Sequence, residues 1–230
     1  MKGKEVMEII GDLASQQWGL VTSAQAKSNG VDLPSLRRLE KRGVFVRIRH
    51  GVYSSATTPL SPELELKAQW LALRPELMAA DRTGDPALAA EAVVSHTTAA
   101  EMWGIGDLWP DGIHFTVRNR RRSRHSDVRF HLAKLINADW TFHPQTELPV
   151  TTVSRTLADL AQADHEVDHL LGLIADAGSK SLLDEQDLLD ALAGHEDALG
   201  VAQGDRTGLR NLLRDYFPRV PGHLTNPRSC

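Results

Sequence analysis

The stretch "VDLPSLRRLEKRGVFVRIRHGVYSS", residues 31–55, decides how the first part of this 230-residue chain folds. Asp32 is a residue type preferred at a helix start, Pro34 is tolerated in a first turn, and Gly43 ends the helical spacing. After Gly43, apolar and basic residues alternate as they do in a strand, and Gly51 supplies the tight turn of a hairpin. The stretch therefore predicts a helix followed by a two-stranded hairpin.

Two shorter helices are predicted before this stretch. Apolar residues fall at helical spacing in residues 5–17. Thr22 or Ser23 can cap a second helix, which Gly30 ends. Three short helices followed by a hairpin is the order of a winged helix-turn-helix, the DNA-binding domain that we expect at residues 1–55.

The rest of the chain is predicted to form a second domain. Residues 56–62, "ATTPLSP", contain two prolines and are typical of a linker. In residues 63–230, "GIHFTV" and "DVRFHLAKL" predict strands, and the segments after residue 155 predict helices. The expected fold is α+β: an N-terminal winged helix-turn-helix, then a larger mixed α/β domain with a helical C-terminal part.

The predicted third helix has an apolar face and a basic face. Leu33, Leu36 and Leu39 share one side, where they would pack on the first two helices. The opposite side would point outward and read bases or contact phosphates, because the arginine fork matches O6 and N7 of guanine. The candidate DNA-binding residues on this helix are Ser35, Arg37, Arg38, Lys41 and Arg42. The alternative is a solvated basic helix face.

The hairpin carries two further candidate DNA-binding residues, Arg47 and Arg49. Strand periodicity predicts Val44, Val46 and Ile48 on one face and the two arginines on the other. A wing beside a recognition helix contacts the DNA backbone, and phosphate contact accounts for the choice of arginine. The alternative is an edge strand that its charges protect from aggregation.

The net charge of −4 conceals two basic segments. Residues 1–55 hold nine basic and five acidic residues, and residues 118–154 hold seven and three. Such a pattern suits a protein that meets a polyanion at chosen faces. The second segment includes a candidate site for nucleic acid or a partner, formed by Arg118, Arg120, Arg121, Arg122 and Arg124. The alternative is a solvated hairpin loop between the two predicted strands.

Other features favour a cytoplasmic location. The N-terminal residues are broken by charges and contain no apolar signal core, and no run approaches the length of a membrane helix. The single cysteine, Cys230, allows neither a disulfide framework nor a cysteine metal site. We therefore expect no membrane contact.

Two motifs suggest catalysis, and neither is convincing. "HEVDH", residues 165–169, matches a zinc-hydrolase string in which His165 and His169 would bind the metal and Glu166 would activate water. However, both histidines fall on a polar stripe and no third ligand is evident. "AGSKSLLDEQD" resembles a nucleotidyltransferase signature, but its carboxylates follow too soon. We therefore expect no catalytic residue, no cofactor and no metal, and keep a metal-dependent hydrolase as an alternative.

Three segments resemble one known family. "LRRLEKRGVFVRIRHGVY", "VVSHTTAAEMWGI" and "LPVTTVSRTLADLA" are similar to segments of the AbiEi antitoxins of type IV toxin–antitoxin systems. The resemblance implies that a winged helix binds inverted repeats in the protein's own promoter, at the nucleoid. It also implies that the second domain counters a nucleotidyltransferase toxin. A further alternative is a protein-interaction module in which the winged helix is incidental.

Overall fold

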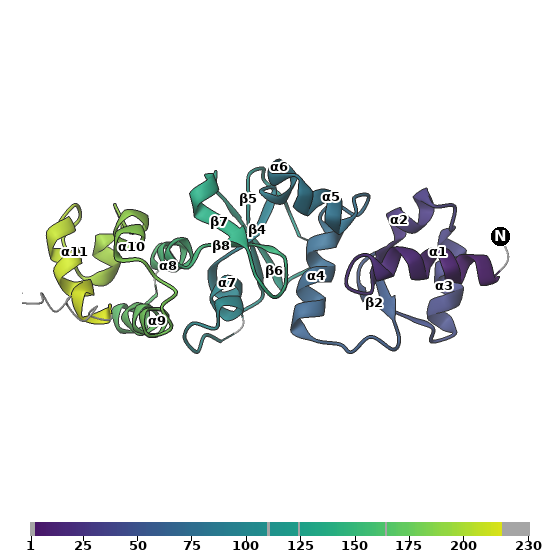
Figure 1. Ribbon diagram of the computed structural model, residues 1–230, viewed down its shortest axis with the longest axis horizontal. Coiled ribbons are helices and arrows are strands. Elements are labelled where there is room, and N and C mark those ends of the chain that lie inside the picture. The colour runs from purple at the N-terminus through teal and green to yellow at the C-terminus, as the bar shows by residue number, and fades with distance from the viewer. Residues whose placement is uncertain (1–2, 110, 124, 164, 218–230) are drawn as a thin grey trace, which may run out of the picture.

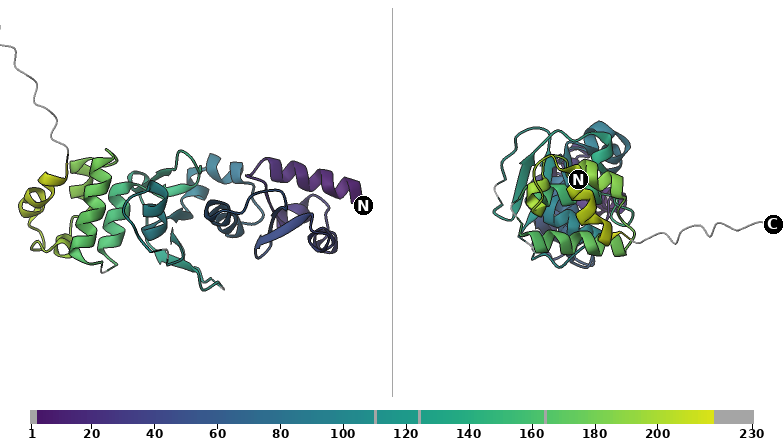
Figure 2. Two further views of the ribbon diagram at one scale, coloured as in Figure 1. Left: turned by 90° about the horizontal axis from the view of Figure 1, so that it is seen from below. Right: turned by 90° about the vertical axis from the view of Figure 1, so that its left-hand side faces the viewer.

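The computed structural model describes residues 3–109, 111–123, 125–163 and 165–217. The molecule is elongated, and three groups of elements follow one another along its long axis (Figures 1 and 2). Each group contains a cluster of buried apolar side chains, and the middle cluster extends into the N-terminal sheet. The N-terminal helices lie at one end, a mixed sheet lies in the middle, and a set of helices closes the other end (Figure 1).

The N-terminal group contains three helices and a three-stranded antiparallel sheet. Its elements are α1 (Gly3–Ser15), β1 (Leu20–Thr22), α2 (Ser23–Ser28), α3 (Leu33–Lys41), β2 (Phe45–Arg49) and β3 (Val52–Ser55). The three predicted helices and the hairpin are confirmed. Strand β1 was not expected; it pairs with β3, which gives the order β1-β3-β2.

The ends of these elements follow local chemistry. The Thr22 side chain accepts a hydrogen bond from the Gln25 amide at 3.0 Å and begins α2. The Asp32 carboxylate accepts one from the Ser35 amide at 2.9 Å and begins α3, as expected. Gly51 has a φ of +75° in the turn between β2 and β3, a conformation that favours glycine.

One side of α3 packs inward as predicted, but only in part. Leu36 and Leu39 are buried with Val6 and Ile10 of α1. Leu33, in contrast, is 44% exposed, so the prediction that all three leucines pack is wrong. Leu33 is the first residue of the helix, and its neighbours Asp32 and Pro34 are exposed as well.

Strand β2 departs from strict alternation. Phe45 is buried, and Val46 is 38% exposed, which is opposite to the predicted orientation of the valine. The register also shifts between Arg47 and Arg49, which pair with the adjacent residues Tyr53 and Val52. This irregularity turns the two arginines to different surroundings, because an inserted residue changes the side to which the following side chain points.

Helix α4 (Pro62–Ala72) joins the N-terminal group to the sheet. It begins within the predicted linker, where the Ser61 side chain accepts a hydrogen bond from the Leu64 amide at 3.1 Å. Leu20 and Val52 of the N-terminal sheet share a cluster of buried side chains with Leu64 of α4. The two parts are therefore joined by apolar packing as well as by the chain.

The middle group is a five-stranded mixed sheet with the order β6-β5-β4-β8-β7. Its strands are β4 (Ala92–Val94), β5 (Ile113–Val117), β6 (Val128–Leu132), β7 (Trp140–Phe142) and β8 (Pro149–Thr151). Its helices are α5 (Ala79–Gly84), α6 (Pro86–Ala89) and α7 (His96–Trp103), and the short 3-10 helix η1 (Asn137–Asp139) precedes β7. The two strands that the sequence predicted here, β5 and β6, are confirmed.

Strands β5 and β6 run parallel, not antiparallel. Ile113 pairs with Val128 and Val117 pairs with Leu132. The arginine-rich connection therefore returns along the length of the strands, and its interpretation as a hairpin loop is wrong. Five residues at about 3.3 Å each give a return path of roughly 16 Å.

The C-terminal group is helical, as predicted. It contains α8 (Val153–Ala161), α9 (Val167–Ser179), α10 (Glu185–Ala191) and α11 (Arg206–Leu213), with the 3-10 helices η2 (Glu196–Leu199) and η3 (Arg214–Tyr216). Leucines such as Leu157, Leu173 and Leu209 build its core. Within the described residues no helix is long and apolar enough to span a bilayer.

The structure confirms the coarse fold class. The protein is a mixed α+β fold with two sheets, and its N-terminal helices are arranged in a way consistent with a helix-turn-helix.

A buried leucine and an exposed leucine of the α3 apolar stripe make a matched pair for a stability test. Leu36→Ala should lower the free energy of unfolding by about 2–4 kcal/mol, because the leucine is 1% exposed and its loss leaves a cavity. Leu33→Ala should change it by less than about 0.5 kcal/mol. Urea unfolding of both variants measures the difference, and equal losses would contradict the observed exposure of Leu33.

Candidate nucleic-acid interface

The basic face of α3 is open to solvent. Arg37, Arg38, Lys41 and Arg42 are all exposed, while Leu36 and Leu39 hold the opposite face against the core. Among the described residues, no carboxylate forms an ion pair with any of these four basic side chains. The predicted arrangement of this helix is therefore present, with four unpaired cations on one side.

The first turn of α3 is ordered by short-range hydrogen bonds. Arg38 Nη2 donates to Ser35 Oγ at 2.8 Å, which holds the guanidinium along the helix. Hydrogen bonding by the Ser35 side chain and backbone lowers the pKa of Asp32, so this capping carboxylate is ionised at neutral pH. Ser35 is half-buried and accepts this hydrogen bond, which orients the arginine, and the DNA contact of Ser35 itself stays a prediction.

Arg47 extends the basic surface beyond α3, on the strand that packs beside the helix. Its side chain is exposed, and Nη2 lies 2.7 Å from Nδ1 of His50. Because a guanidinium only donates, Nδ1 of His50 must accept, which leaves the proton of the neutral ring on Nε2. The contact links Arg47 on β2 to His50 in the hairpin turn.

Arg49 does not belong to this surface. Its side chain is only 11% exposed; Nη1 lies 2.6 Å from Asp127 Oδ2 and Nη2 lies 3.2 Å from Glu65 Oε2. Burial opposes ionisation of Asp127, but the hydrogen bond and charge of Arg49 prevail and the pKa of this carboxyl is lowered. The prediction that Arg49 contacts DNA is corrected: this arginine ties β2 to α4 and to the segment before β6.

The arginine-rich segment is divided between surface and interior. Arg118, Arg120 and Arg122 are exposed. Arg121 is half-buried; Nη1 donates to the Leu73 carbonyl at 2.8 Å and Nη2 lies 3.6 Å from Glu91. Arg124 lies outside the described residues. Arg121 therefore has a packing role, and the three exposed arginines are the ones that remain available to a partner.

The sequence did not predict that Arg82, an arginine near this segment, is buried. Arg82 has no exposed surface; its guanidinium stacks on the Trp70 ring at 3.4 Å, and Nη1 donates to the Trp70 carbonyl at 2.6 Å. Burial lowers the pKa of Arg82 to about 9. The residues next to Arg82 in the sequence are polar and do not predict that this arginine is buried, since its partner, Trp70, lies on another helix.

The "HEVDH" string does not form the metal-binding helix face that the alternative of a zinc hydrolase requires. Helix α9 begins at Val167, so His165 and Glu166 precede it and only His169 is helical. The rings of His165 and His169 meet edge to face with centroids 5.7 Å apart. The histidines that do cluster among the described residues are His96, His114 and His131, which the sequence did not single out. They are distant along the chain, and no spacing rule connects them.

Comparison with known proteins finds a family match for the N-terminal group and a fold match for most of the chain. Residues 8–56 match the sequence model of a family described as transcriptional regulator, AbiEi antitoxin, which confirms the resemblance over this stretch and supports a DNA-binding antitoxin. The crystal structure of the RV2827C protein from Mycobacterium tuberculosis superposes with a TM-score of 0.55 at 17% sequence identity. The match covers 93% of this chain and 82% of that one, and it shows a shared fold. No curated protein sequence matches the chain significantly.

The correction for Arg49 leads to a double-mutant test. Combining Arg49→Met with Asp127→Asn should reveal a coupling of about 0.5–1 kcal/mol in the free energy of unfolding, because the arginine is largely shielded from water. The exposed Lys4–Glu8 pair, whose atoms are 3.7 Å apart, is the control and should couple by about 0.3 kcal/mol or less. Zero coupling for Arg49, together with loss of DNA affinity, would return it to the DNA-binding surface.

Proposed function

We propose that this protein is a DNA-binding transcriptional autorepressor that also serves as the antitoxin of a type IV toxin–antitoxin system. The observation that supports this most directly is the row of unpaired cations on α3, within residues that match the regulator family. In this proposal the N-terminal group is a winged helix-turn-helix, with β2 and β3 as the wing. The protein works on double-stranded DNA in the cytoplasm, at the nucleoid.

The dimensions of α3 suit a recognition helix. An α-helix with its side chains is about 10–12 Å across, which fits the roughly 12 Å width of the major groove, and the nine residues of α3 extend roughly 13 Å along its axis. Arg37 and Arg38 lie one turn into the helix, where base edges are contacted, and Lys41 and Arg42 lie near its end, suited to phosphates. Arg47 on the wing reaches the neighbouring backbone.

The proposed operator is a pair of inverted repeats in the protein's own promoter. An inverted repeat presents two half-sites related by a two-fold axis, so two copies of α3 would read it. The family match supports a DNA partner in general. The repeats and the autorepression are inferred from the resemblance described above.

The antitoxin role is assigned to the part of the protein after the N-terminal group. The proposed counterpart is a nucleotidyltransferase toxin. Arg118, Arg120 and Arg122 form an exposed basic strip that suits either an acidic surface or a nucleic acid bound by the toxin. In this role the protein acts by binding, and we propose no catalysis.

The two alternatives differ in what they require. A hydrolase built on His165, Glu166 and His169 needs a single helical face, whereas α9 includes only the last of the three. A pure protein-interaction module would give no function to the exposed basic side chains of α3. A mobility-shift assay on the upstream DNA separates that module from a regulator.

Two arginine variants should weaken DNA binding in different ways. Arg38→Ala should cost about 1–3 kcal/mol on the operator and relax discrimination at one base pair, with little effect on random DNA. Arg47→Ala should weaken both DNAs by a similar factor and make the slope of log affinity against log salt shallower by about one for each copy bound.

Salt titrations of both variants on both DNAs measure these effects. Arg206→Ala is the control, since this exposed arginine pairs with Asp190 in the C-terminal helices, at the other end of the molecule. If Arg47→Ala leaves the slope and both affinities unchanged, the charge on this strand only protects an edge.

Repression and antitoxicity should separate in the full-length chain. The variant Arg37→Ala/Arg38→Ala/Arg47→Ala should lose repression of a promoter reporter but still protect cells that express the partner toxin. Arg118→Ala/Arg120→Ala/Arg122→Ala should show the reverse. Loss of protection in the first variant, with normal folding and protein level, would place antitoxicity in the N-terminal group.

A further inference from the structure

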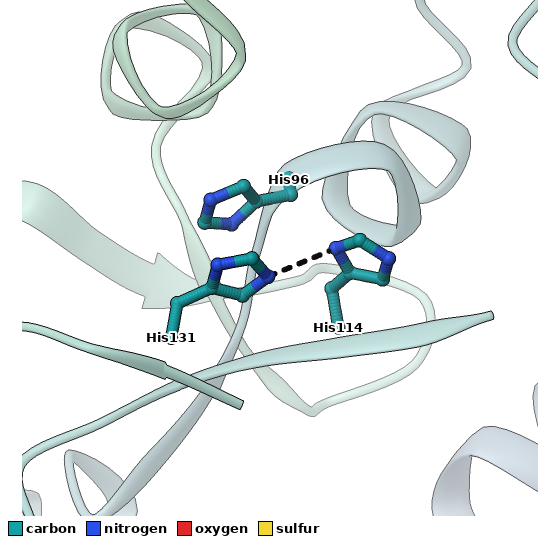
Figure 3. Close-up of side chains that lie close together, drawn as sticks. All are labelled: His96, His114 and His131. Carbon is teal, nitrogen blue, oxygen red and sulfur yellow. Dashed lines mark hydrogen bonds between the residues drawn. The ribbon is translucent and has the colours of Figure 1, made fainter. Parts of the chain in front are cut away.

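Three histidines from three separate elements meet in the middle of the protein. His96 begins α7, His114 lies on β5 and His131 lies on β6 (Figure 3). One nitrogen from each ring can be chosen so that all three lie within 4.8 Å of one another. His131 Nε2 and His114 Nδ1 are 3.1 Å apart, and the His96 and His131 rings stack with centroids 3.5 Å apart.

The fold brings these side chains together for clear reasons. In the parallel pairing of β5 with β6, Thr116 is opposite His131, so His114 and His131 lie on the same face, offset diagonally. The Ser95 amide donates to the His114 carbonyl at 3.1 Å and sets the start of α7 above them. His96 has a φ of +55°, a strained value for a residue other than glycine, and such strain is concentrated at functional sites.

The cluster is buried and electrically neutral. His96 and His114 are buried and His131 is half-buried. Burial, with the nearby histidines as the next cause, lowers the pKa of His96 to about 3 and that of His131 to about 4. Burial also lowers the pKa of His114. At neutral pH each ring therefore keeps a nitrogen lone pair, which is the form in which histidine binds metals.

Two carboxylates, Asp111 and Asp159, lie beside the histidine rings. Asp111 Oδ1 lies 3.0 Å from His114 Nε2, and the same oxygen accepts a hydrogen bond from Thr97 Oγ1 at 2.8 Å. Asp159 binds Arg155 through one oxygen at 2.7 Å. Its other oxygen is buried, 3.9 Å from His96 Nδ1, and makes no hydrogen bond. Burial raises the pKa of Asp159 to about 6.

We propose that His96, His114 and His131 bind one divalent transition-metal ion, with zinc as the best match. Three imidazoles and an open fourth position form a known type of zinc site. The fourth position faces a cavity of about 390 Å³ lined by His96, His131, Arg155 and Asp159, so water or the free Asp159 oxygen can complete the tetrahedron. Asp111 would accept a hydrogen bond from Nε2 of His114 and so orient the ring, as carboxylates commonly do for metal-bound histidines.

Binding requires a small movement of the rings. Bonds of about 2.0–2.1 Å place tetrahedral ligand nitrogens about 3.3 Å apart, so the nitrogens, which lie within 4.8 Å of one another, must close by at most about 1.5 Å. Rotation of the stacked His96 and His131 rings supplies this movement. The bound ion would join α7, β5 and β6, and it would stabilise the middle of the protein independently of DNA binding.

The test uses the full-length protein, purified without a histidine tag, stripped with a chelator and titrated with Zn²⁺ and separately with Co²⁺. We expect one equivalent of zinc to bind and to raise the melting temperature. Co²⁺ should give the visible absorption of a tetrahedral site with nitrogen and oxygen ligands. His131→Gln and His114→Gln should lose the cobalt spectrum and the thermal shift. His169→Gln, which changes an exposed histidine on α9, is the matched control and should keep both.

Circular dichroism checks that the variants are folded, and the wild-type titration decides the question even if they are not. The proposal is overturned if wild-type protein gives neither stoichiometric zinc nor a tetrahedral cobalt spectrum. It is also overturned if His131→Gln, folded, binds zinc as tightly as His169→Gln. Because the readouts involve no DNA, failure here is distinct from failure of the proposed regulatory function.

Discussion

Burial of Trp70 is the interaction on which the junction between the parts of this protein depends. The Trp70 side chain has no exposed surface; its indole N–H donates to the Ala92 carbonyl of β4 at 3.0 Å. Trp18 of the N-terminal group meets it edge to face at 6.2 Å, and Arg82 covers its ring. One side chain on α4 thus contacts both the middle sheet and the turn before β1 of the N-terminal group.

The same junction explains which arginines are buried and which remain exposed. Arg49, Arg82 and Arg121 are drawn into contacts with α4, its neighbours and the segment before β6. Arg37, Arg38 and Arg47 remain at the surface. Burying a cation requires carboxylate or carbonyl partners, and the junction provides Asp127, the Trp70 carbonyl and the Leu73 carbonyl. Arginines in the basic segments of this chain therefore have two roles: some remain exposed at the surface, and others are buried in contacts within the protein.

The middle sheet holds a different kind of polar group. Its histidines are neutral because burial penalises their charged form, and a carboxylate oxygen of Asp159 beside them has no hydrogen-bond partner among the described residues. Buried polar atoms without partners are rare in native proteins, and each one calls for an explanation. A metal ion would give the neutral histidines and the Asp159 oxygen a common binding partner, and metal binding would explain why these polar groups are buried.

The sequence by itself determined the elements whose causes are local. The Asp32 cap, the Gly51 turn and the inward leucines Leu36 and Leu39 were all predictable, because capping, positive φ and helical spacing act within a few residues. The exposed basic face of α3 was predictable for the same reason. Strand β1 escaped prediction because three buried residues show no alternation.

Only the tertiary structure decided what Arg49 and the histidines do. Arg49 alternates with Arg47 in the sequence, yet the irregularity in β2 sends it to Glu65 and to Asp127, which is 78 residues away. His96, His114 and His131 come together only because β5 and β6 pair in parallel under the start of α7. Strand order and register depend on packing across the whole chain, and no local spacing of residues encodes them.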